Sequence, residues 1–258
     1  MMTYQTINFT VDGPVARLAL NKPPLNIINI AMIAEMNNAL ETLAGQPSVR
    51  VLVIEAAVGS KAFSAGVDVA DHTADKVRDM IYGFHRIFRQ LHRLHIPTLA
   101  VVGGAALGGG CELAISCDMI VASERAKFGQ PEIKVGVFPP VAAVILTRLI
   151  PRNYALELLL TGETITAAEA HRLGLVNRVV APDALPAAAE ALTGKLTQLS
   201  GSILRYTRQA ASLGASGSFE KALNAVESFY LDDMMQAFDA HEGLAAFMEK
   251  RPPAWQDR

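Results

Sequence analysis

The sequence predicts an α/β fold followed by a helical C-terminal region. In residues 1–195, apolar runs of strand length alternate with stretches whose apolar residues recur at helical spacing. After Pro186 the strand signals end and only helical patterns remain. No internal repeat or low-complexity linker interrupts the chain, so we expect residues 1–195 and 196–258 to form a core and a helical region in close contact.

Five apolar runs have the length of a strand. Residues 14–20, 50–55 and 98–102 are bounded by turn residues, and residues 117–122 and 176–180 resemble shorter buried strands. Since these runs are separated by helical patterns, we expect an α/β fold in which the strands form a sheet.

Helical patterns lie between the first strands and again near the C-terminus. Residues 30–43 carry apolar side chains at helical spacing, and the pattern is cleaner at Val77, Met80, Ile81, Phe84, Ile87, Phe88, Leu91 and Leu94. Each of these helices should cover one face of the sheet. Thr166 and Glu169 form a capping-box pattern, and a long helical pattern runs from Ser218, a candidate N-cap, to about Lys250.

Composition narrows the class of protein. The chain has 258 residues, of which 51% are apolar and 19% charged, so it can bury a large core. A formal net charge of −2 gives no global attraction to nucleic acid or to an anionic membrane. No run reaches the ~18 apolar residues of a membrane span, and residues 1–13 lack a basic leader, which predicts a cytoplasmic protein.

The two cysteines do not suggest a disulfide or a metal site. Cys111 and Cys117 lie in an apolar segment at a spacing that fits neither a disulfide framework nor a C-x-x-C motif. We therefore expect both to be reduced core residues.

Residues 103–113 form a glycine-rich turn that leaves a buried strand and enters an apolar helix. The first amide N–H groups of a helix have no partner within it, so the N–H of Gly109 is a candidate donor to an anion or an oxyanion. A tight turn without a ligand is an equally good interpretation of this segment alone. A dinucleotide fingerprint is excluded, because Ala105 and Ala106 stand where glycines are required.

Two carboxylates could carry acid and base chemistry. Glu112 lies among apolar residues, where desolvation would raise its pKa. Acidic residues are also common in the first turn of a helix because they interact favourably with the helix dipole, and this is the alternative interpretation. Glu132 lies in a loop in which Gly129 allows a sharp bend and Pro131 fixes the backbone, so its side chain could be presented to a site. Taken alone, a glutamate in such a loop is more often a solvated surface residue.

Residues 61–68 form a third candidate segment, which follows the strand that ends near Glu55. The backbone N–H of Val67 could be a second oxyanion donor, and an ordinary connecting loop is the alternative. Ser64 is a poor candidate nucleophile, because the G-x-S-x-G elbow requires glycine where Ala62 stands.

Together these segments resemble the enoyl-CoA hydratase/isomerase, or crotonase, family from about Pro14 to Arg251. The matching segments, in chain order, are residues 24–26, 63–68, 108–114, 128–132, 161–163 and 174–176. The resemblance implies a crotonase-like spiral of ββα units and a C-terminal helical trimerisation region, assembled as a homotrimer or a dimer of trimers.

The resemblance also implies the site. The N–H groups of Val67 and Gly109 would form the oxyanion hole for a thioester carbonyl, and Glu112 and Glu132 would hold the attacking water and pass a proton to the α-carbon. Coenzyme A is then part of the substrate, and no separate cofactor or metal is expected. The residues expected to bind the acyl-CoA are Asn26, Ser64, Ala65, Gly66, Asp68, Gly108, Pro131, Phe138 and Lys250.

The expected contacts with the phosphates of CoA depend on lysine residues. Lys250 would reach a CoA phosphate across subunits, although a cation at a helix C-terminus explains it equally well. The lysine that the family usually carries just after the Val67-Asp68 segment is absent, because Val69 and Ala70 stand there.

Retention of both glutamates favours hydration of an α,β-unsaturated acyl-CoA. Residues 138–144 depart from the glycine-rich stretch of ordinary enoyl-CoA hydratases, so we expect a reshaped acyl pocket. Together with residues 22–28, this departure resembles the cyclic dienoyl-CoA hydratases and predicts cyclohexa-1,5-diene-1-carbonyl-CoA as the substrate.

Two alternative functions remain open. A Δ3,Δ2-enoyl-CoA isomerase needs only one base. A non-catalytic RNA-binding homologue is suggested by basic residues on residues 75–95, but acidic residues dilute that patch and the net charge is negative. The basic residues are Lys76, Arg78, Arg86, Arg89 and Arg93.

Overall fold

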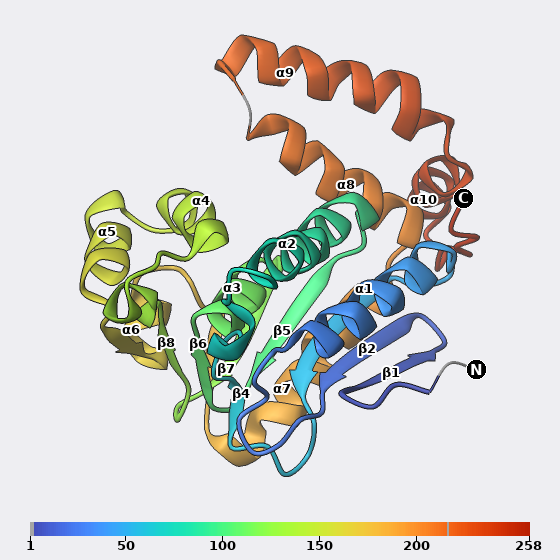
Figure 1. The fold of residues 1–258 in the computed structure, drawn as a ribbon. Helices are drawn as coiled ribbons and strands as arrows, with labels where there is room; N and C mark the ends of the chain where they lie inside the picture. Colours follow the sequence, from blue (N-terminus) through green and yellow to red (C-terminus); the bar gives the residue numbers. More distant parts are fainter. Residues whose placement is uncertain (1–2, 216) are drawn as a thin grey trace.

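The chain folds around two β-sheets. The computed structural model describes residues 3–215 and 217–258. The larger sheet has the strand order β1-β2-β3-β5-β7-β10, and the smaller has the order β4-β6-β8-β9 (Figure 1). The strands of the larger sheet are β1 (Ile7–Asp12), β2 (Val15–Leu20), β3 (Val51–Ala56), β5 (Thr98–Val102), β7 (Met119–Ser123) and β10 (Arg178–Val180). Those of the smaller sheet are β4 (Ala62–Ser64), β6 (Ala105–Leu107), β8 (Lys127–Gly129) and β9 (Thr164–Thr166).

Successive strands alternate between the two sheets. β3, β5 and β7 enter the larger sheet, and each is followed by a short strand of the smaller sheet before the chain turns into a helix. The neighbours from β2 to β10 and from β4 to β8 are parallel, whereas β1 and β9 pair antiparallel at the sheet edges. This arrangement confirms the expected α/β architecture of ββα units.

Helices cover both faces of the larger sheet. α1 (Ile30–Ala44) and α2 (Val77–Leu94) lie on one face and α7 (Leu185–Thr197) on the other (Figure 1). Along β3, Leu52 and Ile54 pack in the main core, whereas Val53 joins a smaller cluster with α7. A strand that is buried on both faces reads as a continuous apolar run, which is why the central strands were predictable.

The strongly patterned elements match the prediction closely. β5 has the predicted bounds, residues 98–102, α2 covers the predicted apolar positions from Val77 to Leu94, and the ends of the other four predicted strands move by one or two residues. The Thr166 hydroxyl accepts a hydrogen bond from the Glu169 N–H at 3.2 Å, so Thr166 is the N-cap of α6 (Ala167–Arg172). The prediction missed β1 and the strands of the smaller sheet, which have only three residues each.

The C-terminal region consists of α8 (Gly201–Gly214), α9 (Phe219–Ser228) and α10 (Phe238–Glu249). The continuous helical pattern predicted from Ser218 to about Lys250 is wrong, because Ala237 is extended, with ψ 137°. The Ser218 side chain also makes no capping bond. The reason for the break is tertiary: Asp239, buried at the start of α10, accepts the N–H groups of Gln256 and Asp257 at 2.8 and 2.9 Å.

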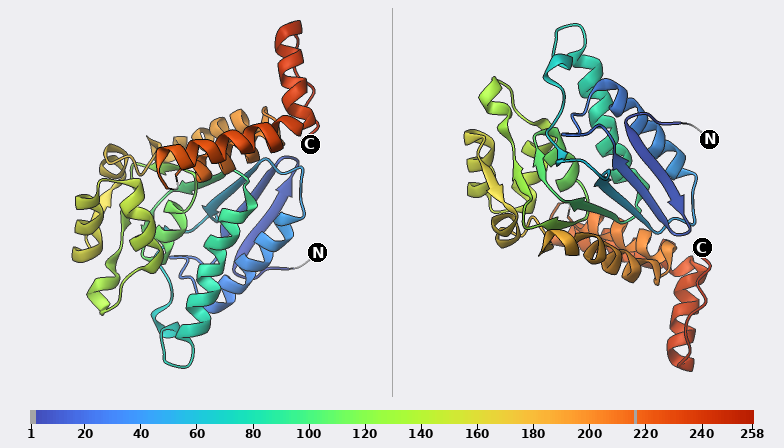
Figure 2. Two further views of the ribbon diagram at one scale, coloured as in Figure 1. Left: turned by 90° about the horizontal axis from the view of Figure 1, so that it is seen from above. Right: turned by 90° about the horizontal axis from the view of Figure 1, so that it is seen from below.

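Ion pairs fix this helical region to the core. Arg50 pairs with Asp257 at 2.9 Å, and Arg208 of α8 pairs with Asp118 at 2.8 Å. The expected boundary at residue 195 lies inside α7, so the chain leaves the sheet a few residues later, before α8. α10 extends away from the body (Figure 2). Within the described residues, no helix is both long and apolar enough to cross a membrane.

Both cysteines are free and buried, as predicted. Burial raises the pKa of the Cys111 thiol to about 12, and that of Cys117 is also raised by burial. Neither thiol is therefore ionised near neutral pH.

Candidate active site

A cavity of about 600 Å³ opens between α2 and the segment of residues 131–140. Its floor is formed by residues 65–67 and by the first residues of α3 (Gly109–Ile115). The α2 wall contributes Val77, Met80, Ile81, Phe84 and His85. A mostly apolar cavity with a few convergent polar groups is the usual form of a small-molecule site.

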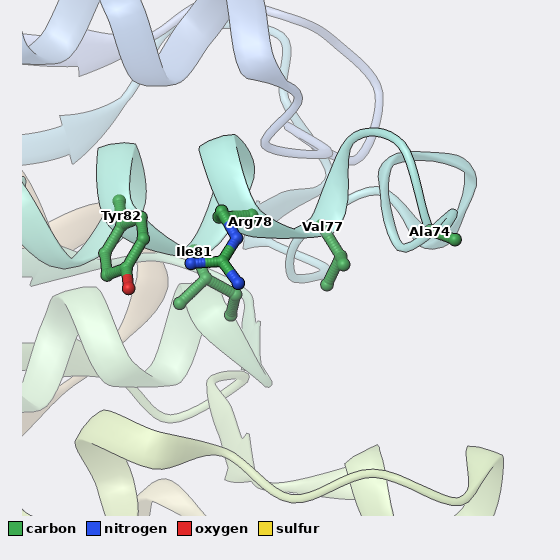
Figure 3. A pocket seen from close by; sticks show the side chains of 5 residues that line it. All are labelled: Ala74, Val77, Arg78, Ile81 and Tyr82. Atoms are coloured by element: carbon green, nitrogen blue, oxygen red, sulfur yellow. The ribbon is translucent and has the colours of Figure 1, made fainter.

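A second, shallower hollow of about 400 Å³ lies along the first turns of α2. Its lining residues are Ala74, Val77, Arg78, Ile81 and Tyr82 (Figure 3). It shares Val77 and Ile81 with the larger cavity but contains no carboxylate. The larger cavity is therefore the one that can carry acid and base chemistry.

Glu112 is buried in the first turn of α3, with 3% of its surface exposed. Its Oε1 accepts hydrogen bonds from the N–H groups of Val141 at 2.8 Å and Ala142 at 2.9 Å, both in the first turn of α4 (Pro140–Leu149). Burial, together with the charge of Glu132, raises the pKa of Glu112 to about 7, although the two backbone hydrogen bonds act in the opposite direction. Glu112 can therefore exchange a proton near neutral pH.

Glu132 lies in the short 3-10 turn Pro131–Val135 and lines the same cavity. Burial raises the pKa of this carboxyl above its ordinary value. Its Oε2 is buried and has no hydrogen-bond partner among the residues that the structure describes. An unpaired buried oxygen of this kind is poised to bind a ligand or a water molecule.

Gly108 lets Glu132 approach α3 closely. Gly108 has φ +52°, and a Cβ built on it would lie 2.6 Å from the Glu132 Oε1. Any other residue would be strained at this φ and would push the carboxylate away. The glycine-rich turn therefore creates the space in which the second acid sits.

Val67 and Gly109 lie side by side at the floor of the cavity. A Cβ built on Gly109 would lie 2.6 Å from the Val67 Cγ2, so the two residues are in direct contact. Among the turn, loop and cap bonds of residues 3–215 and 217–258, neither N–H donates to a backbone carbonyl. Two free donors beside two carboxylates can stabilise an oxyanion while a proton is transferred nearby.

We expect Glu112→Gln to raise the free energy of unfolding by about 3 kcal/mol at pH 8. The pKa of Glu112 is about 7 in the folded chain against an ordinary value of 4.5, so the folded state binds an extra proton between these values. The contribution of this group to stability is thus complete below about pH 4.5 and is lost as the pH rises through about 7. Glutamine stays neutral and keeps an oxygen for the two N–H groups.

Urea unfolding at pH 5 and pH 8 tests this expectation. The stability gain of the variant over the wild type should be large at pH 8 and small at pH 5. A gain that is the same at both pH values would contradict the assignment of a raised pKa to Glu112.

The structure brings most of the predicted site residues into one cavity. Both glutamates line this cavity, so the fold brings together two residues that are 20 positions apart in the sequence. The predicted residues that line the cavity are Ala65, Gly66, Val67, Gly108, Gly109, Glu112, Pro131, Glu132 and Phe138.

Four predicted residues do not line it: Asn26, Ser64, Asp68 and Lys250. The fully buried Asn26 side chain donates to the carbonyls of Ala62 and Phe63, and the Ser64 hydroxyl donates to the Asn26 carbonyl at 2.8 Å. These hydrogen bonds give Asn26 and Ser64 an internal role that supports the floor of the cavity.

Asp68 and Lys250 lie at the ends of helices. The Asp68 side chain accepts the Ala70 N–H and caps a short 3-10 helix beside Val67. Lys250 has φ +56° and ends α10, which extends away from the body (Figure 2). The contact of Lys250 with CoA across subunits stays a prediction.

Sequence reasoning missed the N–H groups that hold Glu112 and the histidine of the α2 wall. Backbone donors leave no residue signature, although the unusual segment 138–144 indicated that this wall differs. His85 was missed because it lies within the amphipathic pattern of α2, which indicates only a helix. Its Nε2 is buried without a partner among the described residues, and burial lowers its pKa, which favours the neutral imidazole.

Comparison with known proteins gives matches along almost the whole chain. The family described as "Enoyl-CoA hydratase/isomerase" matches residues 10–258. "Cyclohexa-1,5-dienecarbonyl-CoA hydratase" of Thauera aromatica is 37% identical over 247 residues, which cover 96% of this chain and 95% of that protein. A "Probable enoyl-CoA hydratase" of Mycobacterium bovis is 38% identical over 260 residues and covers both chains completely.

A solved structure gives the same result in three dimensions. The crystal structure of an enoyl-CoA hydratase from Bacillus anthracis superposes with a TM-score of 0.93 at 30% identity, covering 98% of this chain and 100% of that chain.

Proposed function

Since the chain belongs to the enoyl-CoA hydratase/isomerase family and is an enoyl-CoA hydratase with the crotonase-like fold, we propose that Glu112 and Glu132 are its acid and base. One observation carries this proposal: both carboxylates line a single cavity that Val67 and Gly109, the residues expected to donate their N–H groups, also line. The four groups supply what hydration of an unsaturated thioester needs, namely a base, an acid and an oxyanion site.

The thioester oxygen accepts hydrogen bonds from the N–H groups of Val67 and Gly109. When water attacks the β-carbon, the electrons of the double bond move toward this oxygen and form an enolate. Both donors are fixed by the fold before the reaction and sit in an apolar cavity, so they stabilise the new negative charge without reorganisation. One such donor contributes roughly 3 kcal/mol to the lowering of the barrier.

The contacts of the two carboxylates divide their tasks. The Oε1 of Glu112 is occupied by two backbone N–H groups, which favour the ionised form and leave Oε2 to accept the proton of the attacking water. Glu132, whose buried Oε2 has no partner among the described residues, donates a proton from that oxygen to the α-carbon. The hydroxyl adds to the β-carbon, and one proton then moves from Glu112 back to Glu132 through solvent.

The presence of both acids supports hydration over the two alternatives. Isomerisation shuttles one proton and leaves the second buried carboxylate without a task. An RNA-binding role on α2 gains little support, because Arg86 is paired with Glu41 and Lys76 with Asp71.

We further propose that the acyl group is cyclohexa-1,5-diene-1-carbonyl. A cavity of about 600 Å³ that Phe138, Pro139 and Pro140 line on one side suits a compact, flat, apolar ring. The named activity of the Thauera aromatica relative supports the same choice.

A substrate panel tests this proposal. We expect kcat/KM for the cyclic dienoyl-CoA to exceed that for crotonyl-CoA at least tenfold, because a linear chain leaves part of the apolar wall uncovered. Incorporation of oxygen from labelled water distinguishes hydration from isomerisation. Rapid hydration of crotonyl-CoA together with slow hydration of the ring would overturn the cyclic assignment but not the hydratase mechanism.

The homotrimer or dimer of trimers remains part of the proposal. Phe247 and Met248, near the tip of α10, have 85% and 76% of their surface exposed, and an assembly would cover them. Light scattering measures the mass in solution, and a monomer would contradict this assignment.

A further inference from the structure

α4 begins without a capping side chain of its own. Pro139 occupies the N-cap position with φ −83° and ψ 106°, and Pro140 is the first helical residue. Proline has no side-chain oxygen to accept a hydrogen bond, and Pro140 has no N–H to donate. Elsewhere in the chain, Asn29 and Ser200 cap α1 and α8 with their own side chains.

The free N–H groups of α4 are instead satisfied by Glu112. Val141 and Ala142 are the second and third residues of the helix, and both donate to the Glu112 Oε1, at 2.8 and 2.9 Å. These are the same two positions whose N–H groups a capping serine, aspartate or asparagine would take. A carboxylate from α3 thus occupies the place of a local cap.

A local cap would compete with the catalytic carboxylate. The backbone of Pro139 is in the extended region that N-cap residues adopt, so a serine there could turn its hydroxyl toward Val141 and Ala142. Glu112 would then lose the two donors that fix its orientation and favour its ionised form. Proline at both positions prevents this competition.

We propose that Pro139 and Pro140 are positioning residues for the hydration reaction: they start α4 with two unclaimed N–H groups, and these hold the Glu112 carboxylate in place. The inference rests on the proposed role of Glu112. It extends that role to the segment that forms the acyl wall, since residues 135–140 line the cavity and lead directly into the helix.

Comparison of Pro139→Ser with Pro139→Ala tests the proposal. The two side chains are nearly equal in size, so both variants lose the same proline packing and rigidity, but only serine can cap. We expect kcat of the serine variant to be at least tenfold below that of the alanine variant, with KM within about twofold. The pKa that governs kcat should be higher in the serine variant, because Glu112 has lost its donors.

Pro151 provides a matched control. It is the N-cap of α5 (Arg152–Thr161), also lacks a side-chain capping bond, and does not line the cavity. Pro151→Ser adds a cap of the same kind and should leave kcat and its pH dependence unchanged. If Pro139→Ser and Pro139→Ala have the same kcat and the same pH profile, the positioning role is wrong.

A second measurement separates this inference from the proposed function. Carbon-13 NMR of labelled glutamate gives the pKa of Glu112 directly in both Pro139 variants, without substrate. If the wild type hydrates no enoyl-CoA, the proposed function fails, but a higher pKa of Glu112 in Pro139→Ser would still support the anchoring. An equal pKa in the two variants would overturn it.

Discussion

Glu132→Gln should lower kcat for hydration by about a thousandfold, and Glu112→Gln should do so to a similar extent. Glutamine keeps the shape of each side chain but can neither release a proton to the α-carbon nor accept one from water. Because each glutamate serves one half of the same addition, the double variant should be little slower than either single variant. Steady-state hydration of an enoyl-CoA at pH 7 measures all three.

Binding of the thioester separates chemistry from folding in these variants. Both should bind acyl-CoA with an affinity within a few-fold of the wild type, since the N–H groups of Val67 and Gly109 are untouched. Glu124→Gln changes an exposed acid outside the cavity and should keep full activity. Full activity in either the Glu112 or the Glu132 variant would remove that residue from the mechanism.

Gly109→Ala should lower kcat by about a hundredfold or more. A methyl group at this position would lie 2.6 Å from the Val67 Cγ2 and 3.0 Å from the Phe84 Cζ, so the start of α3 and the Val67 loop must move apart. Both N–H donors then leave their positions, and the enolate oxygen loses its stabilisation. Single-turnover hydration at saturating substrate measures this loss.

Gly194→Ala is the matched control for Gly109→Ala. Gly194 lies within α7, and a Cβ built on it has no neighbour within 4 Å. Its replacement should leave kcat unchanged and stabilise the helix by about 0.5–1 kcal/mol. If Gly109→Ala keeps wild-type kcat, the N–H of Gly109 is not an oxyanion donor.

The elements that the sequence predicts well are those with a long, uniform pattern. β5 matches its expected bounds because it is apolar throughout, and α2 forms where expected because its apolar residues make a clear helical stripe. Short strands such as β4 hold too few residues to show a period. The break before α10 depends on Asp239, which is bound by residues near the C-terminus that no local pattern reveals.

In the candidate site, too, some residues could be predicted from the sequence and others depend on the fold. Glu112, Glu132 and the glycine-rich turn could be predicted, because their residue types carry the chemistry and their order resembles a known family. The N–H groups of Val141 and Ala142 could not, since any residue except proline has one and only the fold brings them to Glu112. Asn26 is the opposite case. The sequence motif predicted that it binds the substrate, but its side chain donates hydrogen bonds to the carbonyls of β4 instead.

The infrared carbonyl stretch of a bound acyl-CoA, labelled with carbon-13 at the thioester carbon, tests the central claim most directly. Hydrogen bonds from Val67 and Gly109 polarise the carbonyl, so its stretch should move to a lower wavenumber on binding to the wild type and to Glu132→Gln, and much of this shift should vanish in Gly109→Ala. A bound thioester that absorbs as it does in water, or a shift unaffected by Gly109→Ala, would contradict the account.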